Sequence, residues 1–365
     1  MRTFGRLSVL SFGGPVAHIA LMHEEVVARR RWIDEQRFLD LIGLTNLIPG
    51  PNSTELAMHI GHDRAGWKGL LTAGGAFILP ASLIVLAVAW VYRRFGQTPV
   101  GGWILEGVKP VVVMIVAQAL LKLLPVAVKG WLTALAGVAA TAAYLVGVNE
   151  ILILFVIAAL VMAISSGNGF VLLGPVAGSV LDPNTATGPF DLDRLAFVFL
   201  KVGALLYGSG YVLAAFLHND LVERWGVLTN GQLLDAIAIG QTTPGPVFTT
   251  ATFIGYYLFG LEGAAVATLA IFLPSFLLVA AVARWGSTVR RYPQTGAFLD
   301  GVNVASLGLM AGVTLQLAVE AIADPLSISL AVVAAGLLLL KVNSVLVIVV
   351  GILAGLAGGW LGAWS

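Results

Sequence analysis

The chain has 365 residues, of which 58% are hydrophobic and 11% are charged. Soluble domains carry roughly 25% charged residues, so the composition excludes an ordinary soluble protein and predicts one that lies in a lipid bilayer. The net charge of +1 gives no electrostatic basis for nucleic-acid binding. The absence of cysteine excludes disulfides, thiolate metal sites and cysteine nucleophiles.

Apolar segments recur along the whole chain. Because crossing a bilayer takes roughly 20 apolar residues, we expect an all-α polytopic membrane protein with about ten transmembrane helices. In the first half the expected spans lie near residues 3–22, 67–92, 105–127, 131–148 and 150–165. In the second half they lie near residues 195–216, 263–283, 300–321, 325–341 and 343–363.

Two further apolar segments, residues 38–60 and 232–257, are each interrupted by the sequence Pro-Gly-Pro, at residues 49–51 and 244–246. Proline removes a backbone donor and clashes with the preceding turn, so a helix cannot continue through such a sequence. Broken backbone at membrane depth is tolerated only where it is buried in protein or lines a water-filled cavity. We therefore predict two re-entrant hairpins, and such breaks in matching halves indicate the binding site of a transporter.

The two halves of the chain are one sequence unit used twice. At a shift of 195 residues the matching pairs include Arg6 with Lys201, Asp40 with Asp235, and Asn46 with Gln241. At a shift of 194 residues they include Gly61 with Gly255 and Pro80 with Pro274. We therefore predict two transporter repeats, residues 1–165 and 195–365, joined by a linker over residues 166–194 that contains an apolar piece near residues 170–180.

Basic residues predict how the hairpins are oriented, because short cytoplasmic loops carry an excess of Lys and Arg. Arg37 precedes the first hairpin and Lys68 follows it, so both of its ends are expected to face the cytoplasm. The ends of the second hairpin are poor in cations and are expected to face outside. With five spans in each half the repeats are then inverted, although Arg93 and Arg94 fall outside and oppose the rule.

Two cations, Arg6 and Lys201, lie inside apolar runs at matching positions of the two repeats. A cation within a membrane span costs at least about 2.5 kcal/mol on insertion scales, so such residues usually face a cavity or a partner. We expect both to offset the charge of a bound anion. The alternative for Arg6 is a side chain that reaches the membrane surface from a position near the N-terminus.

Each Pro-Gly-Pro break is followed by the start of a new helix, where unpaired N–H groups and a partial positive charge attract anions. Polar residues gather at these breaks, and we expect them to hydrogen-bond the oxygens of an oxyanion. The alternative is that they only satisfy backbone groups that the prolines leave free. The predicted binding residues are Asn46, Gly50, Asn52 and Ser53 in the first repeat, and Gln241, Thr243, Gly245, Thr249 and Thr250 in the second.

Glu55 has no acidic counterpart, because Thr250 occupies the matching position. Beside an anion site a carboxylate would repel the substrate unless it were protonated, so Glu55 could couple the movement of a proton to that of the anion. Asp40 and Asp235, which also match, are expected to cap their hairpins, and the alternative is that they pair with Arg37 and a neighbouring cation.

Other reactive residues give less specific signals. His59, His62 and Asp63 lie close together, but a polar loop explains them better than a metal site, and we expect no metal and no cofactor. Ser209 with His218 would suit an intramembrane serine hydrolase, although no companion motif supports an enzyme.

The motifs around the two breaks are specific when taken together. The first half carries Ser11-Phe12-Gly13-Gly14-Pro15, Arg30-Arg31-Trp32 and Pro49-Gly50-Pro51. The second half carries Tyr207-Gly208-Ser209-Gly210-Tyr211, the run from Ala238 to Tyr256 around its own Pro-Gly-Pro, and Leu273-Pro274-Ser275-Phe276. Over essentially the whole chain, this set resembles the two-domain form of the chromate ion transporter family.

The resemblance implies a bacterial or archaeal inner-membrane protein that is associated with chromate efflux and resistance, or with the transport of sulfate-like anions. The chain departs from the usual family pattern at the first break. Thr45 and Asn46 stand where the family commonly has a Cys-Gln pair, and Glu55 stands where a Gln is common. These departures bear on specificity for chromate more than on anion transport itself.

We therefore expect a secondary transporter that moves a divalent oxyanion, chromate above all, out of the cytoplasm. The alternatives are a proton-coupled importer of sulfate or a related oxyanion with Glu55 as the proton carrier, an intramembrane enzyme, and a membrane scaffold without transport activity. Many small residues on the expected helix faces favour a homodimer in the lipid bilayer.

Overall fold

The computed structural model describes residues 1–11, 15–96, 98–165, 188–207, 212–289 and 293–362. All regular structure in this part of the chain is helical, which confirms the prediction of an all-α polytopic membrane protein. The first half contains α1 (Arg2–Leu10), α2 (Pro15–His23), the π-helix η1 (Glu24–Arg29), α3 (Glu35–Thr45), α4 (Asn52–Phe95), α5 (Pro99–Ala127), α6 (Trp131–Leu145) and α7 (Glu150–Ser165). The second half contains α9 (Leu192–Leu205), α10 (Leu213–Leu217), the π-helix η4 (His218–Arg224), α11 (Asn230–Thr242), the 3₁₀-helix η5 (Val247–Thr249), α12 (Thr250–Val289), α13 (Pro293–Ala321), α14 (Pro325–Leu339) and α15 (Ser344–Trp360).

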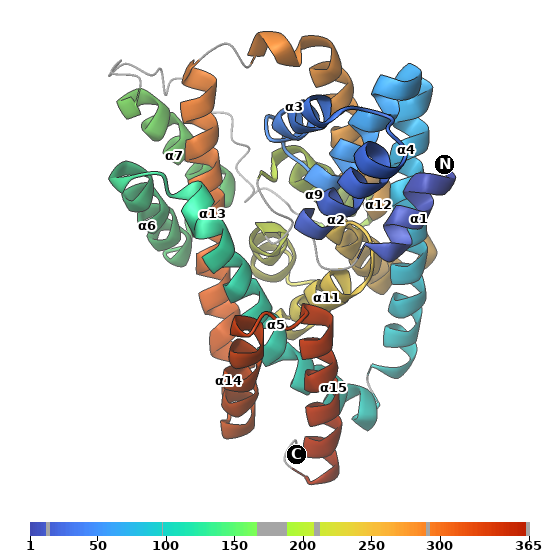
Figure 1. Ribbon diagram of the computed structural model, residues 1–365. Coiled ribbons are helices and arrows are strands. Elements are labelled where there is room, and N and C mark those ends of the chain that lie inside the picture. The colour runs from blue at the N-terminus through green and yellow to red at the C-terminus, as the bar shows by residue number, and fades with distance from the viewer. Residues whose placement is uncertain (12–14, 97, 166–187, 208–211, 290–292, 363–365) are drawn as a thin grey trace.

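The helices of the two halves correspond to one another. α13, α14 and α15 begin 194 residues after α5, α6 and α7, which is the shift found in the sequence. In Figure 1 the matching helices α5 and α13 run in opposite directions, with α6 and α7 towards the upper end of the molecule and α14 and α15 towards the lower end. The two halves are thus inverted copies of one helical unit.

The two halves are also interleaved. α5 of the first half packs against α14 and α15 of the second, while α13 of the second packs against α6 and α7 of the first. One apolar core runs through both halves and includes Val111 of α5 and Leu309 of α13. Because lipid is as apolar as these side chains, close packing rather than exclusion of water holds such helices together.

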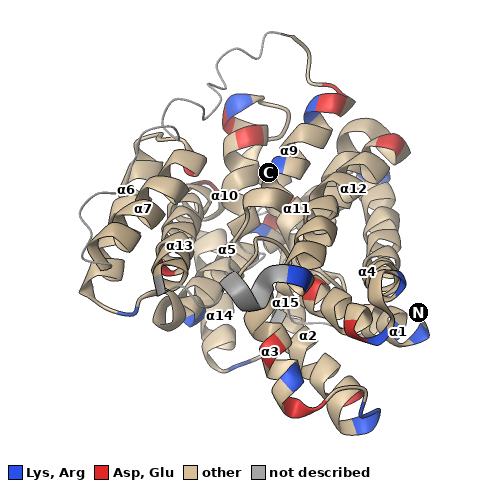
Figure 2. Ribbon diagram, turned by 90° about the horizontal axis from the view of Figure 1, so that it is seen from above, with Lys and Arg blue, Asp and Glu red and all other residues tan. Residues whose placement is uncertain are grey.

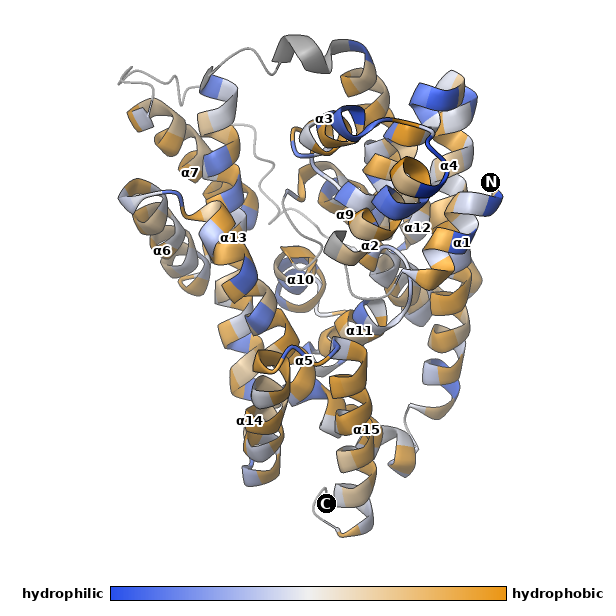
Figure 3. Ribbon diagram, in the orientation of Figure 1, coloured by the Kyte–Doolittle hydropathy of each residue, from blue (hydrophilic) through white to orange (hydrophobic). Residues whose placement is uncertain are grey.

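The outer faces of the helices are apolar as well. Trp131, Val138, Val332 and Leu353 are between 60% and 74% exposed. Figure 3 shows hydrophobic residues along α14 and α15, and Figure 2 shows that most of the helical ribbon carries no charged residue. An apolar exterior of this kind is what contact with the hydrocarbon of a bilayer requires.

Four described helical segments are long and apolar enough to cross a bilayer: Asn52–Phe95, Pro99–Ala127, Val247–Arg284 and Gln294–Ala321. The helices α6, α7, α14 and α15 coincide with other expected spans but have 15, 16, 15 and 17 residues. At 1.5 Å per residue they reach only about 23–26 Å. Short helices of this kind are accommodated by local thinning of the bilayer or by flanking residues that reach its surface.

The spans expected near residues 3–22 and 195–216 are wrong as continuous helices. α1 ends at Leu10 and α9 ends at Leu205, and the residue after each, Ser11 or Leu206, has non-helical backbone angles. α1 has nine residues and is therefore only about 13.5 Å long. Glycine weakens a helix, and the glycines of both predicted motifs, at 13–14 and 208–210, follow these ends but lie outside the described residues.

The helices α4 and α12 each contain a sharp reversal. Ala65 and Gly66 leave the helical region, and the matching Phe259 and Gly260 do the same. Each helix folds back on itself so closely that a Cβ added to Gly61 would lie 2.3 Å from the Gly69 carbonyl oxygen. A short arm that begins at the Pro-Gly-Pro break therefore lies along the long membrane-spanning arm.

The contact between these two arms can be tested with Gly61→Ala. The added methyl group has no room, so we expect the arms to separate and the folded state to lose about 1–3 kcal/mol. The melting temperature of the purified protein in detergent should fall accordingly. Gly75→Ala on the long arm is the control, because its Cβ meets nothing within 4 Å. Equal melting of the two variants would contradict the close packing.

Candidate functional site

The two Pro-Gly-Pro breaks are held by crossed hydrogen bonds between the repeats. The Gly50 N–H donates to the Leu206 carbonyl after α9, with an N···O distance of 2.8 Å. The Gly245 N–H donates to the Ser11 carbonyl after α1, at 3.0 Å. Gly50 matches Gly245 and Ser11 matches Leu206 at the shift of 195 residues. The two bonds are therefore one contact that is formed twice, each time from one repeat to the other.

Both breaks require glycine at their centre. Gly50 has φ of 139° and Gly245 has φ of 100°, where a side chain would be strained. A Cβ on Gly50 would lie 2.5 Å from the Ser275 Oγ, and a Cβ on Gly245 would lie 2.4 Å from the Ala81 Cβ. Because Ala81 and Ser275 match at the shift of 194 residues, each break presses against the same point on the long arm of the other repeat.

A pocket of about 410 Å³ lies beside the first break. Its walls come from the break itself, from the end of α5 and the connection that follows, from α13, and from residues that follow α9. Both repeats therefore contribute to it. The polar residues that line the pocket are Asn46, Asn52, Lys129, Tyr207, Asp300, Asn303 and Ser306.

Lys129 supplies the positive charge of the pocket and is the one cation among the described residues that line it. Its Nζ lies 2.6 Å from the Asp300 Oδ1, so a carboxylate of the other repeat already balances this charge. The Asn52 amide donates to the Asn46 side-chain oxygen at 3.0 Å.

The Ser306 hydroxyl is a buried polar group of the pocket that has no hydrogen-bond partner among the described residues. The side chain is 1% exposed, and its Oγ is buried without a hydrogen bond. Leaving a buried hydroxyl unsatisfied costs about 1–3 kcal/mol. A ligand oxygen in the pocket that accepted its hydrogen bond would remove this cost.

Two predicted residues of the first break lie behind the pocket rather than on its wall. Ser53 is buried, and its Oγ hydrogen-bonds the His18 Nδ1 at 3.1 Å. Glu55 is fully buried, and its Oε1 accepts from the Ser275 hydroxyl at 3.1 Å. The Glu55 carboxyl thus joins the two repeats behind the Gly50 turn, and no described residue bonds its Oε2.

The second break is closed by its own side chains. The hydroxyls of Thr243, Thr249 and Thr250 each donate to a backbone carbonyl three or four residues earlier, at 2.8, 2.9 and 2.8 Å. Gln241 is buried, and its Nε2 has no hydrogen-bond partner in the part of the chain that the structure describes. The structure therefore brings Asn46 and Asn52 together at the pocket, while the predicted residues of the second break do not line it.

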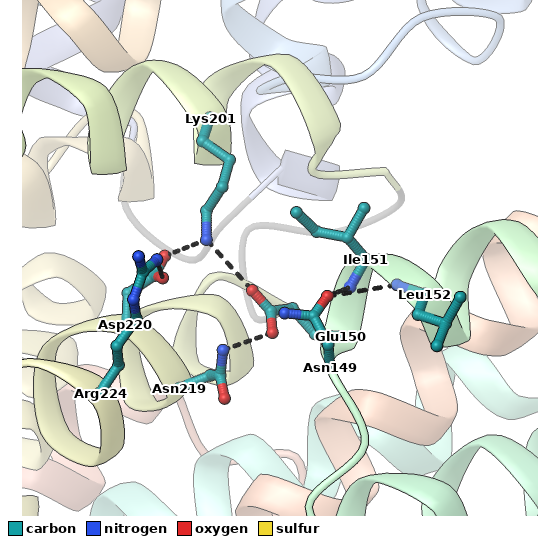
Figure 4. Close-up of polar contacts among 8 residues, drawn as sticks. All are labelled: Asn149, Glu150, Ile151, Leu152, Lys201, Asn219, Asp220 and Arg224. Atoms are coloured by element: carbon teal, nitrogen blue, oxygen red, sulfur yellow. Dashed lines mark hydrogen bonds and ion pairs between the residues drawn. The ribbon is translucent and has the colours of Figure 1, made fainter. Parts of the chain in front are cut away.

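The two predicted cations have different surroundings, and neither lines the pocket. Arg6 is exposed on α1. The Lys201 side chain on α9 is 11% exposed, and its Nζ lies 3.2 Å from the Glu150 Oε1 and 2.5 Å from the Asp220 Oδ2 (Figure 4). The charge of Lys201 is therefore balanced inside the protein by two carboxylates.

The surroundings of Lys201 form a buried ionic network between the repeats. The Asn219 amide donates to the second oxygen of Glu150, and an Arg224 guanidinium nitrogen lies 3.9 Å from the Asp220 Oδ1 (Figure 4). Glu150 opens α7 of the first repeat, whereas the other members belong to the second. Both carboxylates are at most 1% exposed. Removing one partner of a buried ion pair costs about 3–5 kcal/mol because it leaves an uncompensated buried charge, so the folded state requires the members of this network together.

The capping role expected of Asp40 and Asp235 is wrong. The N-cap residues are Asp34 for α3 and Thr229 for α11. Both helices begin earlier than expected, so the two aspartates lie in helix interiors. Asp235 instead accepts from the Tyr92 hydroxyl at 2.7 Å, which ties α11 to α4 of the other repeat.

The remaining candidates are not gathered into a site. Asp63 accepts two hydrogen bonds from Arg37, at 2.6 and 2.8 Å, and no group of three His, Asp or Glu suited to a metal is found in the described part of the chain. The His218 Nδ1 hydrogen-bonds the Tyr144 hydroxyl at 3.0 Å. Ser209 and the apolar piece near residues 170–180 lie outside the described residues.

Most of the pocket lies outside the predicted binding residues. Its residues Lys129, Asp300, Asn303 and Ser306 were not predicted, and Tyr207 appeared only within a motif of the family resemblance. A signal was present in α13, because Asp300, Asn303 and Ser306 recur every three residues and so share one face of a helix. Such a polar stripe in an apolar span marks a face turned towards a cavity rather than lipid.

Comparisons with known proteins agree with one another. A sequence model of the family described as "Chromate transporter" matches residues 1–164 and 194–356. The chain is 34% identical to a chromate transport protein of Cupriavidus metallidurans over 92% of this chain and 86% of that protein. It is 33% identical to a chromate transport protein of Pseudomonas aeruginosa over 98% and 90%, and 25% identical to an uncharacterized transporter of Methanocaldococcus jannaschii over 97% and 92%. No solved structure matches the chain.

The buried ionic network can be tested with Lys201→Met, which leaves Glu150 and Asp220 without their shared partner. We expect the amount of folded protein in the membrane to fall several-fold, because about 3–5 kcal/mol of stability is lost. The amount of folded protein is measured by fluorescence-detected size-exclusion chromatography of a tagged protein. Arg6→Met, at the exposed matching position, is the control and should leave the amount unchanged.

A second variant separates charge balance from other effects. Adding Glu150→Gln and Asp220→Asn to Lys201→Met removes the charges together and should restore much of the folded protein. If the Lys201→Met single variant were as abundant as the wild type, the fold would not need this ammonium. Lys201 would then again be a candidate contact for the substrate.

Proposed function

Since the chain belongs to the chromate transporter family, we propose that it is a secondary transporter that exports chromate from the cytoplasm across the inner membrane. Its relatives are transport proteins and its helices are membrane helices, so it is an integral membrane transporter rather than an enzyme. The observation that carries the proposal is the pocket beside the first break, which both repeats line with hydrogen-bond donors.

The chemistry of the pocket suits a tetrahedral oxyanion. Such an ion has only acceptor oxygens, so a site for it must supply donors from several directions. The ammonium of Lys129, the amides of Asn46 and Asn52 and the hydroxyls of Ser306 and Tyr207 are all donors. Sulfate has the same charge and shape as chromate, and we expect it to compete for the same donors.

Helix α4 adds to the attraction. It begins at Asn52, on the wall of the pocket, and the start of a helix carries a partial positive charge and unpaired N–H groups. In this proposal the predicted contacts Asn46 and Asn52 bind the anion directly, and Gly50 holds the turn that places them. Ser53 and Glu55 support the turn from behind.

The placement of the pocket suits alternating access. Lys129 comes from the first repeat and Asp300 from the second, so a rocking movement of one repeat against the other would change the shape of the pocket. The crossed bonds of Gly50 and Gly245 give such a movement two matching pivots.

The membrane potential favours export. Moving one charge through 100 mV is worth about 2.3 kcal/mol, so a dianion that leaves an inside-negative cell gains about 4.6 kcal/mol. Import would need roughly three protons per dianion to reverse this electrical term. Glu55, which is buried beside the first break, could carry a single proton, so we favour export without a coupled ion over proton-coupled import.

Everted membrane vesicles test the direction and the coupling. With the potential clamped inside-positive, the vesicles should take up radiolabelled chromate, and a proton uncoupler should leave this uptake unchanged. Excess sulfate should reduce it. Uptake that vanishes with the pH gradient at constant potential would favour the proton-coupled importer.

Lys129→Met tests the pocket itself. A hydrogen bond to a charged group is worth about 1.5–3 kcal/mol, so chromate uptake at low concentration should fall by about tenfold or more at equal amounts of transporter. Lys122→Met is the matched control, because Lys122 lies on α5 and bonds Gln118 away from the pocket. If both variants transported like the wild type, the pocket would not be the binding site.

A further inference from the structure

The ion pair between Lys129 and Asp300 has an unusual position for a site that is meant to bind an anion. Lys129 lies in the connection between α5 and α6 of the first repeat, and Asp300 lies in α13 of the second. Both line the pocket, with 2.6 Å between Nζ and Oδ1. The Lys129 ammonium, which would attract a substrate anion, is therefore already paired with the Asp300 carboxylate.

A substrate anion must displace this carboxylate before it can contact the ammonium. The Asp300 side chain is 28% exposed and that of Lys129 is 60% exposed, so water can solvate the carboxylate once it swings away. Asn303 and Ser306 follow on the same face of α13, and the unpartnered hydroxyl of Ser306 gives the incoming anion a second contact.

The outcome of this competition depends on the charge of the incoming anion. The attraction to Lys129 is proportional to the product of the two charges. A monovalent anion gains no more from Lys129 than the carboxylate of Asp300 gives up, so the exchange is close to neutral. A divalent anion at the same distance gains about twice as much, so only the dianion replaces Asp300 with a clear advantage.

We propose that Asp300 is the residue that selects divalent over monovalent oxyanions, by competing with them for Lys129. This inference rests on the proposed function and adds to it the basis of charge selectivity. Because Lys129 and Asp300 belong to different repeats, the exchange also severs a tie between the repeats. A bound dianion therefore replaces the direct Lys129–Asp300 pair with contacts of its own to Lys129 and Ser306, whereas a monovalent anion leaves the pair intact.

Chromate and perchlorate are the probes that isolate charge from shape, since both are tetrahedral oxyanions and perchlorate carries one negative charge. Purified full-length protein in lipid nanodiscs is titrated with radiolabelled chromate, alone and with a hundredfold excess of perchlorate. In the wild type we expect chromate to bind and perchlorate to leave that binding unchanged.

Asp300→Asn removes the competing charge and keeps the size of the side chain. We expect the variant to bind chromate about tenfold more tightly and to let perchlorate displace it. Glu106→Gln is the matched control, because Glu106 occupies the same position in the first repeat and pairs with Lys109 away from the pocket. This control should retain the affinity and the selectivity of the wild type.

The possible failures of the two proposals can be told apart. An Asp300→Asn protein that binds chromate and excludes perchlorate like the wild type would overturn the role of Asp300 and leave chromate transport untouched. A wild type that neither binds chromate here nor moves it in vesicles would instead overturn the proposed function. If Asp300→Asn does not fold, as judged by its melting temperature, Asp300→Ser carries the same expectations.

Discussion

Two backbone hydrogen bonds, from the glycine of each Pro-Gly-Pro break to the end of a helix in the opposite repeat, hold the centre of the molecule together. In lipid every backbone polar group needs a partner within the protein, and each break creates groups that its own helix cannot satisfy. The solution found here is reciprocal, because each repeat completes the broken backbone of the other. The residues that accept these bonds, Ser11 and Leu206, come directly after α1 and α9.

The same reciprocal frame carries two different surfaces. At the second break the hydroxyls of Thr243, Thr249 and Thr250 bond their own backbone. At the first break the asparagines remain on the wall of a pocket that α13 of the other repeat completes. The two breaks differ in their side chains at matching positions. They also differ in backbone, because the second break leads into the 3₁₀-helix η5 whereas the first leads directly into α4.

Much of this arrangement was readable from the sequence. The matching glycines, prolines and charges of the two halves predicted the internal repeat. The Pro-Gly-Pro sequences located both breaks, because a helix cannot continue through two prolines around a glycine. The ends of α1 and α9 were not predicted, because each end lies within an apolar run, where hydropathy does not mark the end of a helix. Lys201 was expected to face the substrate because a sequence shows a buried cation but not its partners, and Glu150 and Asp220 are 51 and 19 residues away along the chain. The pocket wall formed by Lys129 and Asp300 depends on how the two repeats pack together. The sequence pattern does not show which distant residues come into contact.

Among the described residues, the network around Lys201 has no counterpart at the matching positions of the first repeat. At the matching positions of the other repeat stand Arg6, Glu25 and Ser344, and Glu25 is paired there with the exposed Arg29 and Arg30. If the two repeats exchange conformations during a transport cycle, the contacts around Lys201 break. The matching residues Arg6, Glu25 and Ser344 then come together, with the Ser344 hydroxyl in place of the Glu150 carboxylate. The inward-facing and outward-facing conformations of this protein then differ in free energy. Although its two repeats are nearly symmetric, one conformation is preferred even without substrate.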